Sequence, residues 1–481
     1  MKNIWSDIET RIRAGYPFLY LISHEETRLA RKLQTLAVSL GYEFERLGMD
    51  AYPQNSDPLV EFARKPGPGI LVLHDFHLLM NDVFIIRKLK SVKSDLSVGK
   101  KTVIVTAPHY DLPAELDKYF SAMEIPLPDQ DELTRLFTKL CPSVGTDNAR
   151  YFGRAATGLT EDQAIHVFQR ILLEPERIKH GDTGPVIEEK RRLVESEGVL
   201  LFYDRDVSLS DVGGLHALKD WLGEREAAFD QTARNYGLPE PKGLLLLGVQ
   251  GCGKSLTAKA VASHWRLPLV QFDLAATFSS LRSPEETLRR ALQLLEALSP
   301  VVVWIDEVEK AFAGAKQSGE VAVHRVFGHF ITWMQEKRKP VFVVATANAV
   351  EELPPELLRK GRFDELFFVD LPDEKERAEI LKIHIQRRMN DNGEIDIPAL
   401  VEMTRNYTGA ELEQVVLDAL YRAFSKKRKA EQSDFEKSAE KVVPIYNTYE
   451  EDIKRLRDWA KDRTRKASLE TGLTSYFQKE G

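Results

Sequence analysis

The sequence contains few of the features that anchor a protein in a membrane or hold it together covalently. Only two of its 481 residues are cysteine, Cys141 and Cys252, which is too few for a disulfide framework or a multi-cysteine zinc site. No uncharged apolar run approaches the roughly 18 residues of a membrane-spanning helix, and the opening residues lack the apolar stretch of a signal peptide. We therefore expect two free thiols, no membrane partner and a cytoplasmic protein, or a stromal one if the gene is plastid-encoded.

Positive charge is not in excess either. The 67 lysines and arginines face 74 aspartates and glutamates, which gives a formal net charge of −7 at pH 7. This balance opposes the diffuse attraction that drives non-specific binding to nucleic acid, so a nucleic-acid partner is not expected. The composition, 43% hydrophobic and 29% charged, is that of ordinary folded protein, and the length suggests about three domains.

Three short apolar runs occur in the second half of the chain, at 244–247, 301–305 and 341–345. They alternate with segments of helical periodicity, a pattern typical of a parallel α/β sheet. From Lys375 to Ser425 the apolar residues keep helical spacing, and no strand pattern interrupts them. The sequence thus predicts a large α/β domain over residues 206–371, followed by a helical subdomain over residues 372–440.

The first third of the chain repeats this plan. Apolar runs at 18–22, 70–73 and 103–106 come in the same order and at similar spacing. Residues 123–137 then match 366–381 as a strand, a Leu-Pro-Asp turn and an acidic helix start, and a segment beginning Thr157-Gly158 matches one beginning Thr408-Gly409. We interpret residues 1–175 as a degenerate copy of the α/β domain. The alternative is that two α/β domains look alike by chance.

Two charged segments complete the predicted organisation. Residues 174–197 contain Gly-Asp-Thr-Gly-Pro, which indicates a linker with a short helix, and we expect the linker over residues 176–205. Residues 453–466 carry seven lysines or arginines against two aspartates, with Ile453, Leu456 and Ala460 on one helical face. This predicts a basic helical tail over residues 441–481, either docked through its apolar stripe or available to an acidic partner.

A phosphate-binding motif follows the run at 244–247. Residues 248–255 read Gly-Val-Gln-Gly-Cys-Gly-Lys-Ser, a complete G-x-x-x-x-G-K-[ST], and a helix-forming segment comes next. Glycines let the loop approach phosphates closely, Lys254 brings a positive charge to the β- and γ-oxygens, and the Ser255 hydroxyl can ligate Mg²⁺. The predicted nucleotide contacts of this motif are Gly251, Cys252, Gly253, Lys254, Ser255 and Leu256.

Polar residues also follow the next two apolar runs. Asp306 and Glu307 end the run at 301–305, where the first would serve the metal and the second the attacking water. Asn348 follows the run at 341–345, and its amide is expected at the level of the γ-phosphate. Glu307 and Asn348 are therefore predicted catalytic residues, and Ser255 and Asp306 are the predicted metal ligands.

These motifs together resemble the AAA clade of the AAA+ ATPases, which combine a P-loop NTPase sheet with a helical lid. The clade's pattern T-x-N-x(4)-L-x-P-x-L-L-R-x-G-R-F-D is matched here with Asn348, Arg359 and Arg362 in register. The resemblance implies ATP and Mg²⁺ as cofactors and Asn348 as the first sensor. It also implies that Arg359 and Arg362 act catalytically in the site of a neighbouring subunit, in a homo-oligomeric ring whose expected size is a hexamer.

The resemblance covers about residues 206–425. Val212 and Gly213 match the family's adenine-side loop, and Gly409 with Ala410 matches the Gly-Ala pair of its lid. More narrowly, the degenerate first domain, the segment around Arg359 and the basic C-terminal helix resemble an uncharacterised AAA family encoded in chloroplast and cyanobacterial genomes. That narrower resemblance implies no substrate.

The pore loop and the first domain depart from the family pattern. The loop that grips polypeptide usually reads aromatic-x-Gly-Glu, whereas residues 277–285 keep Phe278 but carry Arg-Ser-Pro near the expected Gly-Glu. Phe278 is therefore either a pore residue or a packing residue.

The first domain has Ser-His-Glu-Glu-Thr at 23–27 in place of a P-loop, so we expect no nucleotide hydrolysis there. Four other polar residues of this domain are expected at the carboxyl ends of its strands, His24, His74, Asp75 and His109. They are either ordinary polar residues at strand ends or part of a metal or small-ligand site.

The function that these observations favour is Mg²⁺-dependent ATP hydrolysis coupled to the remodelling of an unidentified protein partner. The alternative is a nucleotide-gated scaffold or regulatory ATPase, whose first domain recruits a partner without threading it. A DNA loader or translocase is disfavoured by the net charge and by the lack of a recognisable DNA-binding module.

Overall fold

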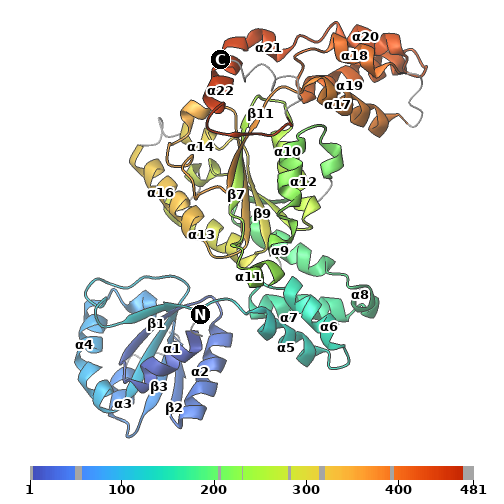
Figure 1. Ribbon diagram of the computed structural model, residues 1–481. Helices are drawn as coiled ribbons and strands as arrows, with labels where there is room; N and C mark the ends of the chain where they lie inside the picture. Colours follow the sequence, from blue (N-terminus) through green and yellow to red (C-terminus); the bar gives the residue numbers. More distant parts are fainter. Residues whose placement is uncertain are drawn as a thin grey trace. The chain divides into compact units, whose positions relative to one another are not determined.

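The computed structural model describes residues 4–48, 57–203, 207–229, 231–279, 283–313, 320–389 and 395–469. Its internal contacts divide the chain into two units, residues 1–183 and 184–481, and each unit has its own sheet (Figure 1). Among the described helices, none combines the length and the apolar character that a membrane crossing requires.

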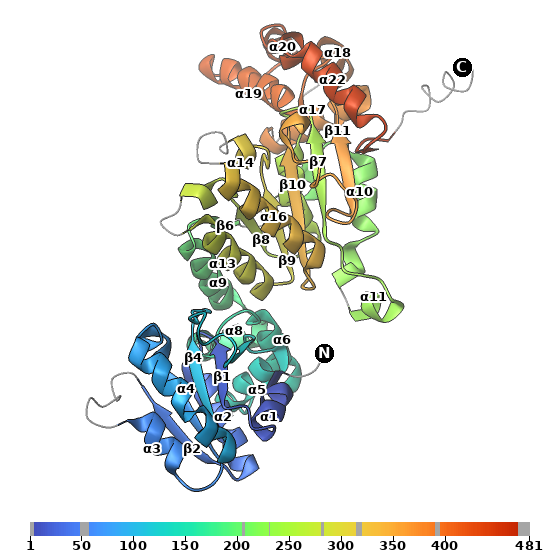
Figure 2. The same cartoon turned by 90° about the vertical axis from the view of Figure 1, so that its left-hand side faces the viewer.

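The first unit is built on a five-stranded parallel sheet of order β2-β3-β4-β1-β5. Successive side chains of a strand point to opposite faces, so the sheet has a core on each side. Leu71 and Val103 pack with the helices α3 and α4, whereas Ile70 and Ile104 pack with α1 and α2 (Figure 1, Figure 2). The strands are β1 (Phe18–Ile22), β2 (Glu43–Leu47), β3 (Gly69–His74), β4 (Lys101–Ala107) and β5 (Ser121–Glu124); the helices are α1 (Ile4–Arg13), α2 (Glu26–Leu40), α3 (Pro58–Arg64), η2 (Phe76–Leu79) and α4 (Val83–Val98).

A helical lid follows the first sheet. Its core is aromatic: the ring of Phe137 stacks on Phe152 at 4.9 Å between centroids and meets Phe168 edge-on at 4.8 Å. These rings are fully buried and tie the three long helices together. The helices are α5 (Gln130–Leu140), α6 (Thr146–Ala155), α7 (Glu161–Leu172) and α8 (Pro175–His180).

The second unit has a seven-stranded sheet of order β12-β11-β7-β10-β9-β8-β6, parallel except for β6. Helices α13 and α16 cover one face, and α10 and α12 cover the other (Figure 1). The strands are β6 (Leu200–Tyr203), β7 (Gly243–Gly248), β8 (Leu269–Phe272), β9 (Val301–Ile305), β10 (Val341–Ala347), β11 (Glu365–Val369) and β12 (Arg465–Lys466). The helices of this layer are α9 (Gly184–Ser196), η3 (Leu209–Asp211), α10 (His216–Gly223), η4 (Glu226–Phe229), α11 (Gln231–Tyr236), α12 (Lys254–His264), η5 (Ala276–Ser279), α13 (Pro284–Ala297), α14 (Lys310–Ala313), α16 (Glu320–Glu336) and η6 (Val350–Glu352).

The second lid follows β11, as the helical spacing after Leu371 predicts. Leu381, Leu400, Leu412 and Phe435 form its buried core, one residue from each helix. The lid helices are α17 (Glu374–Arg388), α18 (Ile397–Met403), α19 (Gly409–Ser425) and α20 (Gln432–Ala439), and the chain then continues into α21 (Ile445–Thr448) and α22 (Glu450–Ala460).

The two sheets share one topology. Numbered in order within each unit, and leaving out β6 and β12, both read 2-3-4-1-5 from one edge to the other. This is the arrangement that a duplicated domain predicts. One detail of the sequence alignment is wrong, because the helix N-cap that corresponds to Thr408 is Thr160 and not Thr157. Both threonines form capping boxes, with Glu411 and Gln163 respectively.

The segment 176–205, expected as a linker, is instead largely structured. Helix α9 is 13 residues long, and β6 pairs antiparallel with β8 through a register that sets Leu200 opposite Phe272. Four apolar residues at a sheet edge are too short a pattern to separate from a loop in the sequence. The strand forms because Leu200 buries against the core of the second unit.

The C-terminal segment is also more than a helical tail. Ile453 and Ala460 of α22 are buried, so the apolar stripe is docked, and Arg457 pairs with Asp370 at 2.8 Å. Beyond the helix, β12 adds a strand beside β11, and the Ala467 backbone N–H donates to the Phe368 carbonyl at 3.0 Å. The charged pair Arg465-Lys466 has no apolar strand pattern, and it is held to the sheet edge by backbone pairing, with the Arg465 guanidinium over the Phe367 ring at 5.7 Å from its centroid.

Candidate nucleotide-binding site

The phosphate loop connects β7 to α12, as its motif predicts. Gly251 and Gly253 adopt φ angles of 78° and 87°, which side chains with a Cβ rarely adopt. This conformation ends the loop at the first turn of α12, so the backbone N–H groups at the helix start are available to an anion.

Lys254 is the first residue of α12, and its side chain is buried. Its Nζ donates to the carbonyl oxygens of Gly248 and Val249, both at 2.8 Å. Burial lowers the pKa of Lys254 to about 8, because two carbonyl groups solvate the ammonium less well than water does. A phosphate group would restore the lost stabilisation, so the residues present fit a polyphosphate.

A cluster of oxygen atoms lies at the ends of β9 and β10. The hydroxyl of Ser255 donates to Asp306 Oδ1 at 2.8 Å, and the hydroxyl of Thr346 donates to the same oxygen at 2.6 Å. Hydroxyl and carboxylate oxygens are the ligands that Mg²⁺ prefers, so the predicted metal ligands are together and fit that ion. The sequence analysis gave Thr346 no role, although its position in the T-x-N pattern is the signal that identifies it.

Glu307 and Asn348 lie beside this cluster and contact each other. The amide Nδ2 of Asn348 donates to Glu307 Oε1 at 2.9 Å, and the backbone N–H of Glu307 donates to Thr346 Oγ1 at 2.9 Å. Glu307 has a φ of 48°, which turns the chain sharply after β9. Its other oxygen pairs with the ammonium of Lys310. The two predicted catalytic side chains are therefore already joined.

These residues line one pocket of about 420 Å³, a size suited to a nucleotide. Val212, Gly213, Leu256, Gly409 and Ala410 line it as well, so the structure brings together the predicted nucleotide and metal contacts. The lid is linked to the phosphate loop, because the Ala410 backbone N–H donates to the Gly251 carbonyl at 3.0 Å. The sequence analysis did not identify three further lid residues that line the pocket, Ile380, Ile383 and His384.

Three family models match the chain. They are the ATPase family associated with various cellular activities (AAA) at residues 244–371, the N-terminal domain of SpoVK-like AAA ATPases at 5–125, and the AAA+ lid domain at 394–437. A protein of Guillardia theta called "Uncharacterized AAA domain-containing protein ycf46" is 36% identical over 478 residues, 94% of each chain. A protein of the same name from Pyropia yezoensis is 35% identical over 97% of this chain and 100% of its own. The chain belongs to the Ycf46 family of AAA proteins.

A wider relationship supports the activity. A proteasome-activating nucleotidase of Thermococcus kodakarensis is 33% identical over 251 residues, 49% of this chain and 62% of its own. With the AAA model matched over β7 to β11, this chain is an AAA ATPase.

Arg359 and Arg362 do not line the candidate nucleotide pocket of this chain, as far as the described residues show. Arg359 is exposed, and Arg362 is half-buried with its Nε lacking a hydrogen-bond partner within the described part of the chain. The turn that leads from them to β11 is fixed to the start of β7, because Asp364 Oδ2 accepts from the backbone N–H groups of Lys242 and Gly243 at 2.6 and 2.9 Å. The structure therefore separates the arginines from their own site.

Phe278 lies in η5, where it is partly buried against the core of the second unit. This contact favours the packing interpretation of that residue. The predicted pore loop continues into residues 280–282, which lie outside the described residues.

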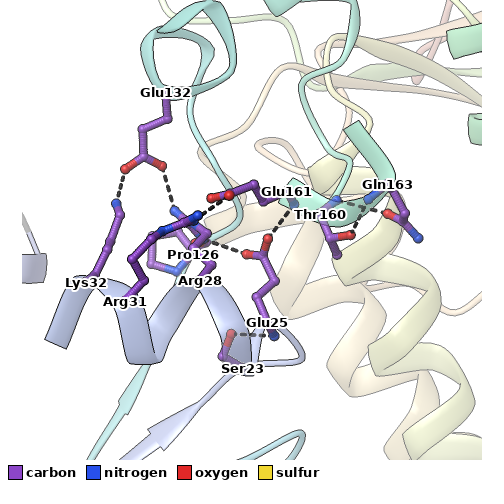
Figure 3. A network of polar contacts seen from close by, with 10 residues as sticks. All are labelled: Ser23, Glu25, Arg28, Arg31, Lys32, Pro126, Glu132, Thr160, Glu161 and Gln163. Atoms are coloured by element: carbon purple, nitrogen blue, oxygen red, sulfur yellow. Dashed lines mark hydrogen bonds and ion pairs between the residues drawn. The ribbon is translucent and has the colours of Figure 1, made fainter. Parts of the chain in front are cut away.

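The first unit has side chains where the second has its phosphate loop. Between Ser23, the register counterpart of Gly248, and α2 there are two residues, against five between Gly248 and α12. Glu25 lies there, buried, and its Oε1 accepts from the backbone N–H of Glu161 at the start of α7 at 2.6 Å (Figure 3). A carboxylate thus occupies the helix start that corresponds to Gly409-Ala410.

An ion network around Glu25 joins α2 of the first unit to its lid (Figure 3). The guanidinium of Arg28 donates to Glu25 Oε2 and to Glu132 Oε2, both at 2.6 Å. Lys32 pairs with Glu132, and Arg31 pairs with Glu161. These bonds connect α2 to the lid, the parts that correspond to α12 and the lid of the second unit, and they leave a phosphate no unpaired cation among Arg28, Arg31 and Lys32.

The strand ends of the first unit carry histidines but no evident metal centre. His74 Nδ1 is 2.8 Å from Thr106 Oγ1, and the rings of His77 and His109 meet edge-on at 5.6 Å. Within the described residues no group of three or more histidine, cysteine, aspartate or glutamate side chains is arranged to hold a metal ion. The structure thus gives no support to the metal alternative for His24, His74, Asp75 and His109.

We expect Lys254→Ala to weaken ATP binding by about 10²-fold, because a charge-assisted contact to phosphate is worth about 2–3 kcal/mol. Isothermal titration of the full-length chain measures this, with Lys259→Ala on the same helix as the matched control. Tight stoichiometric binding that survives in Lys254→Ala would place a nucleotide site elsewhere, for example in the first unit, and would contradict the assignment.

Proposed function

We propose that this AAA ATPase hydrolyses ATP with Mg²⁺ in a homo-oligomeric ring, expected to be a hexamer, and uses the hydrolysis to remodel a protein partner. One observation supports the proposal above the others. Lys254, Asp306, Glu307 and Asn348 meet around one pocket, while both predicted catalytic arginines lie outside it. A complete site then requires a second chain.

Each side chain has a role that its contacts support. Lys254 would exchange its two carbonyl partners for the β- and γ-phosphate oxygens, and Ser255 with Asp306 would supply oxygen ligands to Mg²⁺. Bound Mg²⁺ would supply neutralisation of the phosphate charge. Glu307 would orient the attacking water, with its carboxylate held by the amide of Asn348. Val212, Gly213, Gly251, Cys252, Gly253, Leu256, Gly409 and Ala410 would enclose the nucleotide.

The first unit would bind no nucleotide and would serve another purpose, such as contact with the partner. Its Glu25 carboxylate already occupies the place of a phosphate, and the network around Arg28 is satisfied without one. We propose the cytoplasm, or the plastid stroma if the gene is plastid-encoded, as the location, in keeping with homology to Ycf46 proteins of plastid genomes. A nucleic-acid partner remains unexpected on charge.

Remodelling and scaffolding make different predictions for hydrolysis. If the ring engages polypeptide, casein, used as an unstructured probe, should raise the ATPase rate and should itself become protected from protease while ATP is present. Full-length protein with and without casein measures both quantities, and Lys254→Ala is the control for ATP dependence. An ATPase rate that casein does not raise, together with a digestion pattern of casein that ATP does not change, would favour the nucleotide-gated scaffold. Phe278→Ala is a poor test, because Phe278 packs against the core.

A further inference from the structure

Glu309 is a buried carboxylate beside the hydrolytic pair that no motif identifies. It follows Glu307 by two residues, and it is only 4% exposed. Its Oε1 accepts from the backbone N–H of Asn348 at 2.9 Å, whereas its Oε2 has no hydrogen-bond partner within the described part of the chain. Burial raises the pKa of Glu309, as expected for a carboxyl with so few donors. A group this unfavourable to bury needs a reason to be there.

The position of Glu309 connects it to the reaction through Asn348. The backbone of Asn348 is held by Glu309, and the side chain of the same residue donates to Glu307 Oε1 at 2.9 Å. Asn348 directly follows β10, where no further strand pairing to β9 restrains it. The carboxylate of Glu309 therefore restrains the backbone that carries the Asn348 amide, while Glu307 is also held by Thr346 and Lys310.

The first unit provides an internal comparison. The β3–β4 register sets His74 opposite Thr106, and the same register continued beyond β9 and β10 sets Asp306 opposite Thr346. Asp75 then corresponds to Glu307, and both have a left-handed φ, 54° and 48°. By the same alignment His77 stands for Glu309, and Pro108 stands for Asn348.

In the first unit, both the donor and the acceptor of the Asn348–Glu309 hydrogen bond are missing. Proline has no backbone N–H, so Pro108 cannot make the bond that Asn348 makes, and His77 has no carboxylate to accept it. The surrounding positions keep their character, with Thr106 for Thr346 and buried Phe76 for buried Val308. The sheet end therefore folds without the carboxylate and N–H pair, and the pair is present only in the unit that has a phosphate loop.

We propose that Glu309 is a positioning residue for ATP hydrolysis, which holds Asn348 so that its amide fixes Glu307 on the attacking water. This rests on the proposed roles of Glu307 and Asn348. Glu309 would act on the rate of hydrolysis and not on ATP binding, because it does not line the nucleotide pocket as far as the described residues show.

We expect Glu309→Leu to lower kcat by about 10- to 100-fold, the cost of a small misplacement of reacting groups. The Kd for ATP should stay within about twofold, since Lys254 and the loop still bind the phosphates. Glu309→Gln, which keeps an acceptor oxygen for the Asn348 N–H, should retain most of the activity. Glu352→Leu, an exposed glutamate beyond Asn348, is the matched control.

A double-mutant cycle separates positioning from a structural role. If Glu309 acts through Asn348, Glu309→Leu should cause no further loss of kcat in an Asn348→Ala background, whereas independent effects would multiply. Multiplying losses, a raised Kd for ATP, or full activity in Glu309→Leu would each overturn the proposal, and so would a Glu309→Gln chain that is as slow as Glu309→Leu. If Glu309→Leu is fully active and Glu307→Gln is slow, only the role of Glu309 is refuted and the proposed function stands. If Glu307→Gln hydrolyses ATP at the wild-type rate, the proposed role of Glu307 is refuted, and the role of Glu309 with it.

Discussion

Replacing Arg359 and Arg362 together by alanine should lower the ATPase rate by about 10³-fold or more while ATP binding stays unchanged. Arginines that reach a phosphoryl group from outside are typically worth about 10³ to 10⁵ in rate. In this structure neither arginine lines the pocket of its own chain, so their removal leaves the contacts of Lys254 and Ser255 intact. Lys360→Ala, which changes an exposed cation between the two arginines, is the matched control.

Mixing two inactive chains tests whether the arginines act across a subunit boundary. A Lys254→Ala chain keeps its arginines, and an Arg359→Ala/Arg362→Ala chain keeps its phosphate loop. The mixture of these two variants should recover ATPase activity that neither variant has alone. In a separate measurement on wild-type protein, the ATPase rate per chain should rise with protein concentration. Near-zero activity in a mixture shown by sizing to co-assemble would refute the trans role. Undiminished activity of a demonstrated monomer would refute the ring.

Glu307→Gln should lower kcat by about 10²- to 10⁴-fold and leave the Kd for ATP close to that of the wild type. The amide can still accept from Asn348 Nδ2 but can no longer act as a base toward water, a contribution of about that size in general base catalysis. Single-turnover hydrolysis and nucleotide titration on the same preparation measure the two quantities. Sizing of this slowly hydrolysing chain with ATP gives the size of the assembly.

The first unit supplies the control for that experiment. Asp75 takes the place of Glu307 there, with a nearly equal φ, in a unit whose loop carries Glu25 in place of the phosphate loop. Asp75→Asn should leave hydrolysis unchanged. An unchanged kcat in Glu307→Gln would move the role to another residue, and a slow Asp75→Asn chain would show that the first unit contributes to the reaction.

The chemistry of the second unit could be predicted from local patterns. A phosphate loop needs Gly251, Gly253, Lys254 and Ser255 at fixed spacing, and the loop lies between a strand and a helix because both flanks are encoded next to it. Parallel strands end at the same sheet edge, so Asp306 and Asn348 had to meet the loop once their strands were identified. The duplicated plan of the first unit was readable for the same reason, since each strand there is a compact apolar run.

Other features depended on contacts between segments far apart in the sequence. Thr346 bonds Asp306 forty residues away, and Glu309 bonds Asn348 thirty-nine residues away. The T-x-N pattern marks Thr346 in the sequence but does not name its partner, and the sequence analysis assigned no role to Glu309. The edge strand β12 is made of Arg465 and Lys466, whose side chains carry no strand signal because the backbone makes the pairing. In the first unit, the network around Glu25 and Arg28 likewise requires α2, α5 and α7 to be folded together.

By itself the sequence determined the two α/β plans, the phosphate-loop motif of the second and its absence from the first, because these depend on residues within single motifs and on strands with their own apolar pattern. Only the tertiary structure decided which groups contact Glu307 and Asn348, where the C-terminal strand docks and which ion pairs form around Glu25 in the first unit. Those outcomes depend on hydrogen bonds and ion pairs between distant segments, and such bonds leave no periodicity or spacing in the chain that makes them.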